Sequence, residues 1–113
     1  MDEKLFEQYA HLGLIKSVDK PIEGMDSAQK AHLNRRGNEL FNLGKIDTAR
    51  RIFQTTGYSD GLIRIGEKYL ENGNPVDALK MFELAHDKNR CTLLVEKAAF
   101  AIRKLLEEEE SNE

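Results

Sequence analysis

The sequence predicts an all-α protein made of antiparallel helical hairpins, about six helices in total. Two observations lead to this prediction. Apolar residues recur at helical spacing along most of the chain, and no alternating strand pattern competes with them. One pattern of small and large apolar residues also occurs twice, with every position offset by 29 residues. A repeat of that length is typical of helical units that stack and bury one another's apolar faces.

The composition fits one small globular domain. The chain has 113 residues, 40% of them hydrophobic and 33% charged, which is typical of a soluble helical domain. The single cysteine excludes an internal disulfide and a multi-cysteine metal site. No run approaches the ~20 apolar residues that span a bilayer. The N-terminus is acidic and amphipathic, so we expect no secretory signal, no membrane contact and a cytoplasmic protein.

We expect three regions along the chain. Residues 1–25 form an N-terminal helix and loop, with the helix over residues 2–16. Residues 26–106 form the repeat domain with a closing helix at its C-terminal end. Residues 107–113 form an acidic, disordered tail, because its glutamates would lie at the negative end of the preceding helix dipole.

The second and third helices are delimited by capping residues. The second begins near Asp26, which has capping-box spacing to Gln29, and Gly44 ends it in the left-handed conformation. The third covers about residues 46–54, and Thr55-Thr56-Gly57 closes it.

The fourth helix begins after Ser59, the expected N-cap, and ends at Gly73. The fifth has Asn74 as its N-cap and Pro75 at the first helical position, and its inner face starts at Val76.

The sixth helix is expected over residues 92–106. Its main apolar stripe is Leu94, Val95, Ala98, Ala101, Ile102 and Leu105. Leu93 and Phe100 fall on the opposite side at 100° per residue. Either another helix of the same chain covers these two residues, or they form a second contact surface.

The repeated pattern resembles the tetratricopeptide repeat family over residues 30–86. Four kinds of position carry the resemblance: a small residue at the helix crossing, a large apolar residue one turn later, an alanine and an aromatic residue. They are Gly37 and Gly66, Leu40 and Tyr69, Ala49 and Ala78, Phe53 and Phe82. The chain departs from the family in its spacing of 29 rather than ~34 residues, in lacking the usual proline after each unit, and in having two units rather than ~3.

The resemblance implies a non-catalytic adaptor. In such folds the first helix of each unit lines a groove that holds a peptide or helix of a partner protein. Carried over by position, the groove residues are Asn34, Arg35, Asn38, Phe41, Asn42, Ile63, Arg64, Glu67, Leu70 and Glu71. Some members grip a C-terminal carboxylate, but Asn34 stands where lysine is expected, so we do not predict that activity.

Two other functions compete with this one. Residues 30–68 carry eight basic and four acidic side chains, so this basic middle segment could serve nucleic-acid binding or regulation. The pI of 5.7 is far below the basic values that are usual for nucleic-acid-binding proteins. Nucleic-acid binding therefore ranks below protein binding. The other alternative is a self-assembling structural subunit, a homodimer formed through Leu93 and Phe100.

No residue pattern predicts catalysis, a metal or a cofactor. The histidines His11, His32 and His86 lie on different segments without a second ligand type at metal spacing. His86 and Cys91 are close in sequence, but one such pair makes neither a zinc site nor a catalytic dyad. We therefore do not expect an enzyme.

Overall fold

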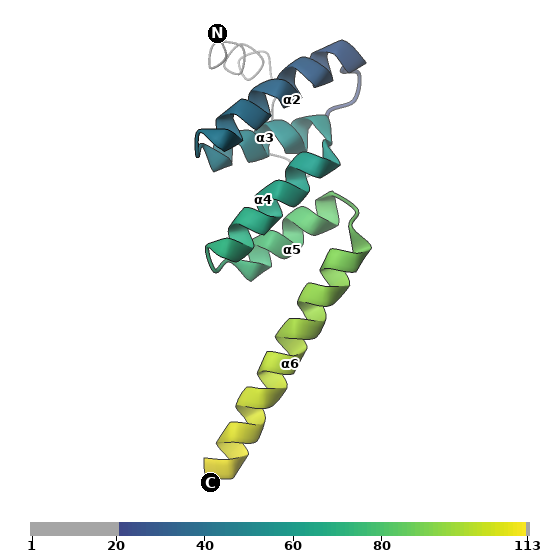
Figure 1. Cartoon of the computed structure of the whole chain (residues 1–113). Helices are drawn as coiled ribbons and strands as arrows, with labels where there is room; N and C mark the ends of the chain where they lie inside the picture. Colours follow the sequence, from purple (N-terminus) through teal and green to yellow (C-terminus); the bar gives the residue numbers. More distant parts are fainter. Residues whose placement is uncertain (1–20, 113) are drawn as a thin grey trace.

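The described part of the chain is all-helical, as the sequence predicts. The computed structural model describes residues 21–112, and these contain no strand. Their five helices are α2 (Ser27–Asn42), α3 (Ile46–Thr56), α4 (Ser59–Glu71), α5 (Pro75–Leu84) and α6 (Lys88–Asn112) (Figure 1). The helix expected over residues 2–16, within the predicted N-terminal region 1–25, lies outside the described residues.

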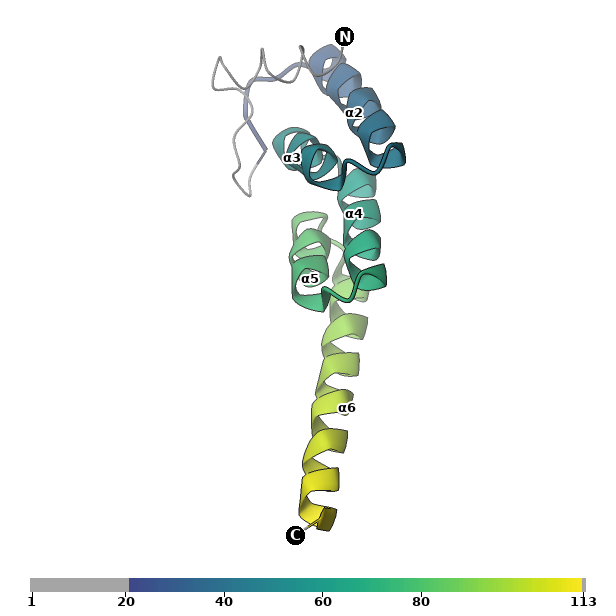
Figure 2. The same ribbon diagram turned by 90° about the vertical axis from the view of Figure 1, so that its left-hand side faces the viewer.

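The helices form two hairpins followed by one long helix. α2 pairs with α3, and α4 pairs with α5, each pair running antiparallel (Figure 1). α2, α4 and α6 run in the same direction, and a quarter turn shows α3 and α5 in one row beside α2 and α4 (Figure 2). α6 projects beyond the hairpins and gives the molecule an elongated shape of 60 × 25 × 20 Å.

The predicted capping residues delimit the first hairpin. The Asp26 carboxylate accepts a hydrogen bond from the Gln29 backbone N–H at 2.8 Å. The Gln29 side-chain oxygen accepts one from the Asp26 N–H at 3.1 Å, which completes the capping box. Gly44 and Gly73 both have positive φ angles, of 83° and 78°, so each ends its helix in the conformation that glycine adopts without strain.

Two helix ends differ from the sequence prediction. α3 continues through Thr56, because Thr55 and Thr56 are both buried and the Thr55 carbonyl accepts a hydrogen bond from the Ile22 N–H at 3.0 Å. Tyr58, rather than Ser59, precedes the first helical residue of α4. Both differences amount to one or two residues, which is the usual spread of helix ends.

α6 is longer at both ends than the predicted helix over residues 92–106. It begins at Lys88 because the Asp87 carboxylate accepts a hydrogen bond from the Arg90 N–H at 3.0 Å and so caps the first turn. It also continues through residues 107–112, where the sequence analysis places the disordered tail. Leucine and glutamate are strong helix formers, and here that propensity outweighs the unfavourable dipole.

Each hairpin closes where a phenylalanine ring lies against a glycine. A Cβ atom added to Gly37 would lie 2.6 Å from the Phe53 ring, and one added to Gly66 would lie 2.5 Å from the Phe82 ring. Only glycine lets the two helices approach this closely. The structure thus confirms the role that the repeated pattern predicts for these four residues, all of which are buried.

Candidate functional site

Four of the predicted groove residues form one cluster across α2 and α4, which we call the Arg64 cluster: Asn38, Phe41, Asn42 and Arg64. The Arg64 guanidinium lies over the Phe41 ring, 4.4 Å from Cζ to the ring centroid. Arg64 Nη1 donates a hydrogen bond to Asn38 Oδ1 at 2.7 Å, and Nη2 donates one to Asn42 Oδ1 at 3.4 Å. The cluster therefore joins the first helices of the two hairpins.

The Arg64 cluster holds a charged group in a fixed orientation. Stacking on Phe41 and bonding to two amide oxygens restrict the Arg64 side chain, which is half-buried. These bonds use two of the five N–H donors that a guanidinium carries. The cluster can offer further donors to a carbonyl or carboxylate oxygen.

Other predicted groove residues bind within the chain. The Thr56 hydroxyl donates a hydrogen bond to Asn34 Oδ1, so Asn34 helps to join α2 to α3. Glu71 forms an ion pair with Lys68, 3.3 Å from Nζ to Oε2. Arg35 is exposed on α2 and belongs to neither contact.

Glu67 and Leu70 line a second feature, a cavity of about 220 Å³ between α4 and α6 that we call the α4–α6 cavity. The buried Phe82 of α5 and the exposed Arg90 of α6 also line it. The full lining is Glu67, Leu70, Phe82, Arg90, Leu93, Leu94 and Lys97. The combination of apolar walls with both charge signs at the rim suits an apolar side chain of a peptide.

Arg90 and Lys97 also line this cavity, and no sequence pattern predicted them there. Arg90 Nη2 pairs with Glu67 Oε1 at 3.0 Å and Nη1 pairs with Asp87 Oδ2 at 2.7 Å, so Arg90 links α4 to the start of α6. The hydrogen bonds from the Arg90 backbone and side chain lower the pKa of Asp87. The spacing Asp87-x-x-Arg90 could have predicted the role of Arg90. It places a helix-capping carboxylate three residues before a cation that can pair with it.

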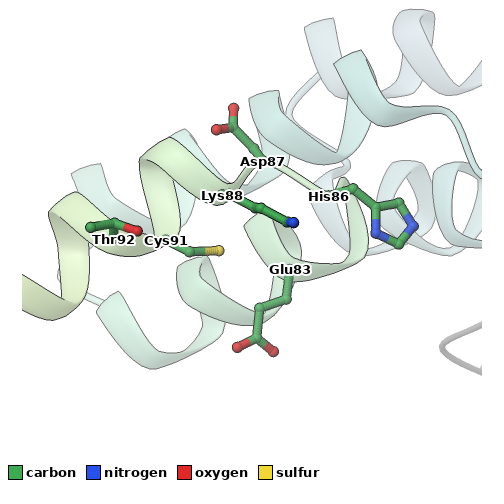
Figure 3. Close-up of a pocket in the computed structure, with 6 residues that line it drawn as sticks. All are labelled: Glu83, His86, Asp87, Lys88, Cys91 and Thr92. Atoms are coloured by element: carbon green, nitrogen blue, oxygen red, sulfur yellow. The ribbon is translucent and has the colours of Figure 1, made fainter.

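A further cavity of about 370 Å³ lies where α5 turns into α6 (Figure 3). Glu83, His86 and Cys91 are among its lining residues, and the His86 ring points away from Cys91. Burial raises the pKa of the Cys91 thiol, and the charge of Glu83 raises it further. Both effects disfavour the reactive thiolate, and no metal-binding group of three ligands occurs among residues 21–112.

The basic middle segment is partly engaged inside the chain. Arg36 pairs with Glu39 at 2.9 Å from Nη1 to Oε2, and Lys68 pairs with Glu71. Phosphate binding needs several cations on one face. These contacts reduce the charge that the segment offers to a polyanion.

The two residues predicted for self-association, Leu93 and Phe100, both lie exposed on α6. Leu93 borders the α4–α6 cavity, whereas Phe100 lies two turns farther along the helix. None of the helices in the described part of the chain has the length and apolar content needed to cross a membrane.

Comparison with known proteins finds one clear relative. No family model matches the chain, and no solved structure matches it. An uncharacterised protein from Treponema pallidum (strain Nichols) is 36% identical over 92 residues, which cover 81% of this chain and 88% of that protein. On this identity and coverage, the chain belongs to the same family as the uncharacterised treponemal protein.

Proposed function

We propose that the chain is a non-catalytic protein-interaction module, an adaptor of the tetratricopeptide-repeat kind, which binds a peptide or helix of a partner across α2 and α4. The observation that carries the proposal is the Arg64 cluster. Its guanidinium is held by Phe41 and two asparagines before any partner arrives, so little side-chain entropy is lost on binding.

The geometry indicates which peptide would bind. Arg64 and Leu70 are six residues apart on α4, about 9 Å along the helix axis and about 120° around it. An extended peptide that rises about 3.3 Å per residue therefore needs more than three residues to join them. We propose a partner segment with an acidic side chain for Arg64 and, more than three residues away, an apolar side chain for the α4–α6 cavity.

A pull-down with matched variants tests this function. The double change Asn38→Ala and Arg64→Ala removes the Arg64 cluster, and Arg103→Ala removes the same charge from an exposed site on α6. We expect the wild type and Arg103→Ala to retain the same discrete protein from native lysate at low and high salt. We expect the double variant to lose it while keeping its helical circular dichroism spectrum.

The same experiment tests the alternative. If the double variant retains the partner as well as Arg103→Ala does, the Arg64 cluster is not the binding site. If only nucleic acid is retained and is lost at high salt, the basic middle segment is the functional surface, because phosphate contacts weaken steeply with salt.

A further inference from the structure

α6 occupies the place of the first helix in a third repeat unit. The 29-residue offset that relates Leu33 to Leu62 next reaches Cys91, and the offset that relates Gly37 to Gly66 next reaches Val95. α6 also runs in the same direction as α2 and α4 (Figure 1). On α2 and α4 these positions face the second helix of the hairpin, where Phe53 and Phe82 pack.

No second helix of the described chain covers that face of α6. Four apolar residues fall on the same side of α6 as Cys91 at 100° per residue. We call them the α6 face: Val95, Ile102, Leu105 and Leu106. They are 51%, 57%, 62% and 54% exposed. In Figure 2 the row formed by α3 and α5 is not continued beside α6 by any labelled helix.

This apolar face requires a partner. An amphipathic helix in water owes most of its stability to packing of its apolar face rather than to propensity. The distal half of α6 reaches beyond both hairpins, so the hairpins do not provide this packing (Figure 1). Four large apolar side chains in one stripe are typical of a helix–helix seam.

The charges of α6 select the orientation of the partner helix. Residues 88–104 carry five basic side chains and one acidic, whereas residues 107–110 are four consecutive glutamates. In a parallel pair of α6 helices the two glutamate runs would face each other. In an antiparallel pair each run faces the basic half of the other helix.

We propose that a second copy of this chain covers the α6 face, with the two α6 helices antiparallel. Each α6 then takes the place of a second helix that the described part of the other chain does not supply, and the antiparallel arrangement is the one found inside both hairpins. The same patch serves both copies, as a two-fold dimer requires. This interface is distinct from the Arg64 cluster.

Sedimentation of the full chain with matched variants tests the dimer. Ile102 and Phe100 are 57% and 58% exposed but lie on opposite sides of α6, so Ile102→Asp and Phe100→Asp place the same charge on two faces. We expect a wild-type dimer that Ile102→Asp weakens by about tenfold or more, because a carboxylate is buried in an apolar seam. We expect Phe100→Asp to leave the dimer intact.

Three results would overturn the proposal. A wild-type chain that is monomeric at every concentration shows that a different protein, or another part of the same chain, covers the α6 face. Loss of the dimer only in Phe100→Asp assigns the contact to the opposite side of α6, and equal loss in both variants shows that the contact is not confined to the α6 face.

A spin label near the end of α6 tests the orientation. Ser111→Cys in a Cys91→Ala background carries one label per chain at an exposed site. The antiparallel dimer places the two labels about 30 Å apart at 1.5 Å per residue. A separation of roughly 10 Å, the usual distance between packed helix axes, would establish a parallel pair and contradict the charge argument.

Discussion

The junction between α3 and α4 and the junction between α5 and α6 occupy equivalent places in the repeat but are packed differently. At the first, Phe53 packs against Gly37 of its own hairpin and also against Gly61 of the next helix, where an added Cβ would lie 2.6 Å from its ring. At the second, Phe82 packs against Gly66, but the position equivalent to Gly61 is Arg90.

The difference lies in the residue that the next helix presents at this position, glycine at the first junction and arginine at the second. Glycine at position 61 lets α4 contact the Phe53 ring directly. Arg90 instead pairs with Glu67 of α4, and Phe82 and Arg90 both line the α4–α6 cavity. The cavity that we propose for a partner side chain therefore borders the phenylalanine ring at the second junction, whereas glycine contacts the ring at the first.

The largest expected loss of stability comes from removing the Phe53 and Phe82 rings. Phe53 and Phe82 are 0% and 1% exposed, and a buried Phe→Ala change costs about 3–5 kcal/mol. We expect Phe53→Ala to fall near 5 kcal/mol, because Phe53 is packed from both sides. We expect Phe82→Ala to fall near 3 kcal/mol, because one side of its ring already borders a cavity.

Urea denaturation followed by circular dichroism measures both free energies of unfolding. The m-values must agree with the wild type for the comparison to hold. Equal losses, or a larger loss for Phe82→Ala, would show that the two junctions are packed alike.

A smaller change in the free energy of unfolding is expected from substituting Gly61, the residue that distinguishes the first junction from the second. In an uncrowded helix Gly→Ala stabilises by about 0.5–1 kcal/mol. Gly61→Ala should instead destabilise by roughly 1–3 kcal/mol, because the new methyl group overlaps the Phe53 ring. Arg90→Ala, the matched change at the second junction, should alter the free energy of unfolding less, and thermal melts of both variants would check this.

A stabilised Gly61→Ala variant would contradict the close contact. A variant that melts at the wild-type temperature would show that the Phe53 ring moves aside at no cost, which also contradicts the tight first junction.

Much of the hairpin architecture was predictable from local sequence. The capping box at Asp26 and the left-handed glycines at 44 and 73 act within a few residues, so spacing alone reveals them. The contacts of Gly37 and Gly66 follow from the repeat, because a residue that recurs at a fixed offset keeps its place in each unit.

The contacts that the sequence did not predict join residues far apart in the chain. Arg64 reaches Asn38 across 26 residues, and Arg90 reaches Glu67 across 23, which no local pattern encodes. Val76 was expected on the inner face of α5 but is 79% exposed, because it lies in the first turn of that helix, at the end of the hairpin. The length of α6 was underestimated because its glutamate run was judged by the helix dipole rather than by helix propensity.

The smallest effect concerns the charge that anchors α6. Hydrogen bonds from Arg90 hold the pKa of Asp87 below its ordinary value, so the ionised carboxylate is favoured in the folded chain. Its stabilising contribution is therefore complete above the unfolded pKa of about 3.9, and is lost as the pH falls through the lower folded value.

Arg90→Met removes the hydrogen bonds of the Arg90 side chain but keeps the backbone N–H. The pKa of Asp87 should therefore rise only part of the way to its ordinary value. A carboxyl titration by NMR of the wild type and Arg90→Met measures this. An Asp87 pKa that is unchanged by Arg90→Met would mean that the backbone N–H alone, and not the Arg90 side chain, lowers it.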